Sequence, residues 1–133
     1  TKETLQQLIG EVGSILRNPV DVSPAQFRGP ETLFRALETV AREPGIDVIL
    51  LQEDMDIMLS FLGKPETRDI NSFLTGFSRA SGTPLVMILP QGSAEAERVE
   101  LEDEFLDAGV PVFPTMARAA RALGLLRQRP VLP

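Results

Sequence analysis

Three carboxylates stand close together near the middle of the chain. Glu53, Asp54 and Asp56 follow soon after the short β-branched, nearly all apolar stretch from Ile46 to Leu51. Clustered carboxylate oxygens are ligands that Mg²⁺ prefers, and a pair of carboxylates can act as general acid and base. The same acids also favour the positive N-terminal turn of a helix. Because no glycine-rich phosphate loop accompanies them, the pattern favours helix-stabilising acids over a magnesium or acid–base site.

A second polar segment, Gly92-Ser93, precedes an acidic helical pattern. Backbone N–H groups at such a helix start can hold an anion. Glu95 and Glu97 already place negative charge in the first turn, so an incoming phosphate would be repelled. We therefore predict that Ser93 is a plain N-cap of the helix.

A third polar segment begins at Thr115, after the apolar run from Val110 to Phe113. No acid follows Thr115 and Met116, and Arg118 adds positive charge. Thr115, Met116 and Arg118 thus form a candidate anion-binding helix start. The alternative, which the pattern favours, is that Thr115 caps the helix and Arg118 lies in solvent.

Charge is segregated in this part of the chain. Seven acids and one arginine lie between Glu95 and Asp107, whereas four arginines and no acid follow Asp107. Solvated helix faces explain this pattern most simply. In a larger parent protein, either patch would instead steer docking against a neighbour.

Residue types that are missing exclude several functions. The chain has no cysteine and no histidine. Disulfides, thiolate nucleophiles, Ser-His-Asp schemes and His-ligated metals therefore cannot arise from this chain alone. The net charge of −6 and the lack of Trp and Tyr argue against nucleic acid or an anionic membrane as partner.

The length of 133 residues is that of one compact domain. We predict that residues 1–133 form a single domain, with 127–133 as a linker, from a larger multidomain protein. The longest unbroken apolar run, Leu85 to Leu89, is too short to cross a bilayer. No signal-peptide pattern opens the sequence, and we expect a cytoplasmic protein.

Helical patterns alternate with short apolar runs along the whole chain. The predicted helices cover about residues 1–12, 30–43, 67–81, 93–108 and 115–126, and the predicted strands 18–22, 46–51, 85–89 and 110–113. The second and third strands are nearly all apolar, as strands buried on both faces are. The helices between them have the length of right-handed crossovers.

This alternation predicts a three-layer α/β fold of the flavodoxin-like kind, with a mainly parallel sheet of about four strands. Strand order cannot be read from the sequence. In open parallel sheets, ligands bind outside the carboxyl ends of the strands. The polar segments that begin at Asp21, Gln52, Pro90 and Pro114 follow those ends.

Three segments together resemble a known family. The first is Asn18-Pro19-Val20-Asp21-Val22, the second runs from Glu43 to Leu50, and the third runs from Ala108 to Thr115 and is followed by an alanine-rich helical pattern. The three segments occur in the order found in NDP-forming acyl-CoA synthetases. The similarity is to one flavodoxin-like subdomain, related to the C-terminal domain of the succinyl-CoA synthetase β subunit. It extends from about residue 5 to residue 127.

The resemblance implies a part in an acid–thiol ligase. Such enzymes convert an acyl-CoA, phosphate and NDP into acid, CoA and NTP through a phosphohistidine carried by another domain. CoA, NTP and Mg²⁺ would bind to the parent's CoA-binding and ATP-grasp domains, which would be this chain's partners. The chain alone would bind no cofactor and would have no catalytic residue. Its residues nearest the phosphate would be Asn18, Asp21, Ser23 and Gln52.

One departure from the family concerns the segment after the second predicted strand. Succinyl-CoA synthetase-type relatives have a glycine-rich turn there, whereas Gln52 to Asp56 is acidic and has no glycine. A carboxylate about 4 Å from a phosphate charge costs roughly 4 kcal/mol at an effective dielectric near 20. This opposes close approach of a phosphohistidine.

Two alternatives to an enzyme domain of this kind stay open. One is a non-catalytic regulatory or protein-interaction module, for example in a fusion of a synthetase-like module with an acyltransferase. The other is a magnesium-dependent hydrolase built on the carboxylates after Leu51, which predicts that millimolar Mg²⁺ stabilises the fold against heat.

Overall fold

The computed structural model describes residues 1–9, 15–16, 18–22 and 30–128. In these ranges the chain is an α/β protein with six helices and a small open parallel sheet of three strands. The elements are α1 (Lys2–Ile9), β1 (Ile15–Leu16), β2 (Val20–Asp21), α3 (Pro30–Ala41), β3 (Ile49–Gln52), α4 (Met55–Phe61), α5 (Gly63–Ser81), β4 (Leu85–Ile88), α6 (Glu95–Asp107), β5 (Val112–Phe113) and α7 (Met116–Arg127).

The parallel sheet has the order β3-β4-β5. Ile49 pairs with Leu85 at one end of the β3–β4 ladder, and Met87 pairs with Val112 at the start of the β4–β5 ladder. Every residue of the central strand β4 is buried. The prediction of a strand at 85–89 that is covered on both faces is therefore confirmed.

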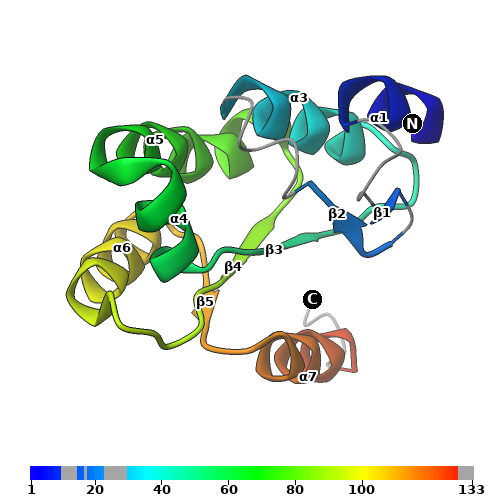
Figure 1. Cartoon of the computed structure of the whole chain (residues 1–133). Helices are drawn as coiled ribbons and strands as arrows, with labels where there is room; N and C mark the ends of the chain where they lie inside the picture. The colour runs from blue at the N-terminus through cyan, green and yellow to red at the C-terminus, as the bar shows by residue number, and fades with distance from the viewer. Residues whose placement is uncertain (10–14, 17, 23–29, 129–133) are drawn as a thin grey trace.

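The prediction of about four strands in this sheet is wrong, because the first predicted strand, at 18–22, is not part of it. β2 pairs antiparallel with β1 in a separate two-stranded sheet, with Leu16 opposite Val20. Pro19 lacks the N–H that a central strand needs at that position. Val20 and Val22 pack instead against the buried side chains of α1 and α3, and this cluster holds the hairpin beside those helices (Figure 1).

Alternate residues of β4 face two different cores, because successive side chains of a strand point to opposite faces. Leu85 and Met87 join the larger core under α3, α4, α5 and α6. Val86 and Ile88 pack with Ala119 of α7 on the other face. Figure 1 shows α7 alone below the sheet, with α3 and α5 above it. The sheet thus has helices on both faces.

Most helix boundaries follow the local signals in the sequence. Pro30 is the first residue of α3, where its missing N–H costs nothing, and Gly82 ends α5 in the left-handed region with φ 72°. The segment between β3 and β4 differs from the predictions in two features. α4 is a separate helix, and α5 begins at Gly63 rather than near Thr67.

None of the helices in the described part of the chain combines the length and the apolar composition that a membrane span requires. α7 includes Arg127, the first residue of the predicted linker, and 129–133 lie outside the described ranges.

Candidate functional site at the carboxyl edge of the sheet

The carboxyl ends of β3 and β4 bring the acidic segment close to the start of α6. The backbone N–H of Glu53 donates to the carbonyl of Ile88 at 3.0 Å, so the two strand ends stay paired. Beyond this point the chain turns into α4 on one side and α6 on the other, as Figure 1 shows. The three carboxylates of the segment then take three different environments.

Asp54 is the N-cap of α4. Its carboxylate accepts hydrogen bonds from the backbone N–H groups of Asp56, at 3.0 Å, and Ile57, at 3.2 Å. These are two of the donors that a helix start leaves without intrahelical partners. For Asp54, the interpretation as a helix-stabilising acid is confirmed.

Asp56 stabilises a different helix. Its two carboxylate oxygens accept from the N–H groups of Ser93, at 2.7 Å, and Ala94, at 2.6 Å, at the start of α6. These bonds to the charged form hold the pKa of Asp56 below its usual value. A Cβ at Gly92 would lie 2.6 Å from an Asp56 oxygen, so this close approach needs glycine.

The prediction that Ser93 is the N-cap of α6 is wrong. The N-cap is Ala94, which makes no side-chain cap hydrogen bond. Asp56 supplies the missing acceptor from 37 residues away in sequence, and Glu95 and Glu97 in the first turn do not prevent it. The helix start therefore holds an anion, and that anion is part of the chain.

Glu53 is buried, with 3% of the residue exposed. Neither of its carboxylate oxygens has a hydrogen-bond partner among the residues that the structure describes. Burial disfavours the charged form and raises the pKa of Glu53 to about 7. A carboxyl group with this pKa is present in both protonation states near neutral pH, unlike an ordinary glutamate.

The three acids do not converge on one point. Asp54 accepts through Oδ1 from backbone N–H groups of α4, and Asp56 accepts through both oxygens from N–H groups at the start of α6. Glu53 lies in the protein interior. Among the described residues, no group of three acidic side chains has a geometry that could hold a metal ion. The carboxyl edge of the sheet therefore has an anion site at the start of α6 that the Asp56 carboxylate already fills, and one buried acid, Glu53.

The other predicted phosphate neighbours are divided between two parts of the molecule. Gln52 is exposed at the end of β3. Asn18 is exposed and Asp21 half-buried, and both belong to the β1–β2 hairpin region. Figure 1 draws that hairpin away from the end of β3 where α4 begins. Ser23 lies outside the described residues.

At the start of α7 the capping interpretation is confirmed. The Thr115 hydroxyl oxygen accepts from the backbone N–H of Arg118 at 3.3 Å. Arg118 and Met116 are exposed. The reading of Thr115, Met116 and Arg118 as an anion-binding start stays a prediction.

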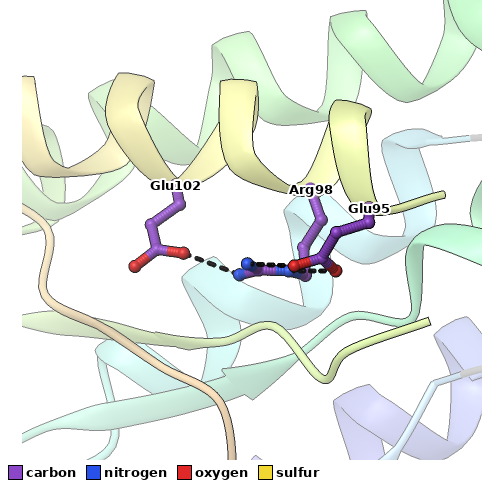
Figure 2. Close-up of polar contacts among 3 residues, drawn as sticks. All are labelled: Glu95, Arg98 and Glu102. Atoms are coloured by element: carbon purple, nitrogen blue, oxygen red, sulfur yellow. Dashed lines mark hydrogen bonds and ion pairs between the residues drawn. The ribbon is translucent and has the colours of Figure 1, made fainter.

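An ion cluster around the buried Arg98 of α6, formed with the half-exposed Glu95 and Glu102, was not predicted from the sequence. Arg98 is 9% exposed, and its guanidinium donates two hydrogen bonds of 2.8 Å to Glu95 and one of 2.6 Å to Glu102 (Figure 2). Both carboxylates raise the pKa of Arg98, because they favour its charged form. The sequence did contain a signal for these ion pairs, because acids three residues before and four residues after an arginine lie beside it on a helix.

A groove of about 520 Å³ lies between the C-terminal halves of α3 and α5, with Arg42, Phe73 and Phe77 among its lining residues. These helix ends lead into the beginnings of β3 and β4. The groove is therefore near the amino ends of the strands, away from the edge where open parallel sheets bind ligands.

Comparison of the chain with models of protein families, with curated proteins and with solved structures gave no match.

Proposed function

We propose that the chain is a flavodoxin-like, non-catalytic domain of a cytoplasmic NDP-forming acyl-CoA synthetase. Support comes from the three resembling segments, each of which contains or leads into a strand of an α/β domain. Asn18 to Val22 contains β2, Glu43 to Leu50 runs into β3, and Ala108 to Thr115 contains β5 and ends at the cap of α7. In this proposal the CoA-binding and ATP-grasp domains of the parent carry the CoA, NTP and Mg²⁺ sites.

The observation that carries the non-catalytic role is the carboxylate of Asp56 on the start of α6. A phosphate at the carboxyl edge of a parallel sheet would bind the backbone N–H groups of such a helix start. Those of Ser93 and Ala94 already donate to Asp56, at 2.7 and 2.6 Å. A phosphate beside this carboxylate would meet repulsion of roughly 4 kcal/mol at about 4 Å and an effective dielectric near 20.

The role that fits this filled edge is a structural one. The domain would present its helices and the open end of its sheet to neighbouring domains, and the exposed Gln52 would lie at that boundary. Catalysis would then depend on this chain for assembly of the site and not for a reacting group.

A regulatory or interaction module is the second candidate. The observation in its favour is the exposed apolar surface of α7, where Leu125 is 58% and Leu126 61% exposed at the end of the helix. Contiguous exposed apolar surface marks interaction sites on proteins, and these two leucines are adjacent in sequence. The gene around the chain separates the candidates. Flanking CoA-binding and ATP-grasp segments favour the synthetase, and an acyltransferase segment favours regulation.

The synthetase proposal is tested by acyl-CoA-dependent NTP formation. We expect no turnover from the isolated chain, turnover from the parent protein, and loss of turnover from a parent in which this domain is deleted. Gln52→Ala in the parent should lower the rate, whereas Gln128→Ala after α7 is the matched control on another surface. Turnover by the isolated chain, or full activity without the domain, would refute the proposal.

A further inference from the structure

We propose that this chain associates head to tail with further copies of itself, through the outer face of α6 on one copy and the outer face of α7 on the next. The two faces are on different helices of the same chain, and both are exposed. They are complementary in charge, in apolar content and in the spacing of the side chains involved. The inference does not depend on the proposed function.

The α6 face consists of Val99, Asp103, Leu106 and Asp107. The inner side of α6 is fixed by Leu101 and Phe105, which are buried in the larger core. Val99 and Leu106 lie on the other side, and Leu106 is 52% exposed. Asp103 and Asp107 are exposed beside them, and no ion pair joins either one to another described residue. An apolar pair flanked by acids is thus left open to solvent.

The α7 face consists of Arg118, Arg121 and Leu125. Ala119 fixes the inner side of α7, since it is fully buried against the sheet. Arg118, Arg121 and Leu125 are all exposed, and α7 contains no acid. Their spacing of three and then four residues puts them on one side of the helix. Neither arginine has an ion-pair partner among the described residues.

The two faces match when the helices run antiparallel. Arg118 then lies opposite Asp107, Arg121 opposite Asp103, and Leu125 opposite Val99. Steps of four residues on α6 correspond to about 6 Å, and steps of three and four residues on α7 to about 4.5 and 6 Å, a difference that arginine side chains span. The α7 arginines also come to lie at the C-terminal end of α6, where the helix dipole favours positive charge.

One chain cannot form this contact within itself. α6 packs in the core with α3 and α5, whereas α7 packs on the opposite face of the sheet. Figure 1 draws the two helices on different sides of the strands. The contact is therefore heterologous, and each copy in a pair keeps one free face, so that assembly continues until a ring closes or a filament grows.

Sedimentation velocity of the 133-residue chain over a range of concentrations tests the proposal. At about 50 mM NaCl we expect species larger than the monomer at high micromolar concentration, and an association constant at least about tenfold weaker at about 500 mM NaCl, where surface charges are screened. A chain that stays monomeric at about 500 μM in low salt would overturn the proposal.

Charge reversal tests the pairing itself. Arg118→Glu/Arg121→Glu and Asp103→Arg/Asp107→Arg should each weaken association at least about tenfold. The chain that carries all four substitutions should associate again, because its charges are exchanged and still complementary. Circular dichroism checks that each variant keeps its helices. A quadruple variant as weak as either double variant would contradict the assigned pairing.

Net charge needs its own control, because reversing two arginines makes the net charge more negative. Arg35→Glu/Arg68→Glu changes two exposed arginines on α3 and α5 and alters the net charge by the same amount. This variant should associate like the wild type. If it weakens association as much as Arg118→Glu/Arg121→Glu does, general repulsion is the cause and the proposed interface is wrong.

Discussion

Replacing Glu53 with glutamine should remove a pH dependence of stability that burial creates. Burial raises the pKa of Glu53 from 4.5 to about 7. Between these values the folded chain keeps a proton that the unfolded chain has lost. The stability contributed by the neutral carboxyl group is therefore fully present below pH 4.5 and is lost as the pH rises to about 7. At 1.36 kcal/mol per pH unit, the loss amounts to about 3 kcal/mol.

The assay is urea unfolding of the wild type and Glu53→Gln at a series of pH values from 4 to 8. Glutamine keeps the size of the side chain and stays neutral at every pH, so its own burial adds only a constant offset. The difference in unfolding free energy, variant minus wild type, should rise by about 3 kcal/mol across this range. Glu104→Gln, which removes an exposed carboxylate from α6, is the matched control for loss of one acid.

A difference in unfolding free energy between Glu53→Gln and the wild type that is the same at pH 4 and at pH 8 would rule out a raised pKa of Glu53. A constant difference would mean that Glu53 ionises in the folded chain as easily as in the unfolded chain. Carbon-13 NMR of the Glu53 carboxyl group gives the same answer independently, because its titration midpoint should lie near 7.

Three further predictions concern the rest of the fold. Gly92→Ala should destabilise the chain by about 1–3 kcal/mol, because the added Cβ would overlap the carboxylate of Asp56. In an Asp56→Ala background the same substitution should cost clearly less stability. A double-mutant cycle of thermal unfolding measures the difference. Thr115→Ala should cost about 1 kcal/mol in urea unfolding through loss of the α7 N-cap, and Thr115→Ser should retain most of it. Phe105→Ala should cost about 3–5 kcal/mol, whereas the change of its exposed neighbour, Leu106→Ala, should stay within about 0.5 kcal/mol; equal effects would contradict the assigned inner face of α6.

The sequence predicted those elements whose structure depends on residues that are near them in the chain. The five apolar residues from Leu85 to Leu89 can only be covered on both faces, and they are. Thr115 precedes a helix with no competing cap, and it caps it. In each case the residues that determine the outcome lie within one or two turns of the element.

The pairing of β2 was not predictable in the same way. Two-residue strands carry almost no periodic signal, and the partner of β2 is fixed by the packing of Val20 and Val22 against α1 and α3. α4 was hidden for another reason. Its buried residues Met55 and Met58 have helical spacing, but they share their segment with the acids that dominate its composition.

The different contacts of Glu53, Asp54 and Asp56 could not be predicted from the composition of their segment. Their proximity in sequence left open a shared task, such as holding a metal ion, although the pattern favoured acids that stabilise a helix start. At the end of a parallel strand, however, consecutive residues point in different directions, and each meets a different neighbour: a helix that follows at once, a helix start 37 residues away, and the core. Only the first neighbour can be read from the sequence. Because the carboxylate of Asp56 accepts from the N–H groups at the start of α6, this edge of the sheet is held by a contact within the chain and without a ligand.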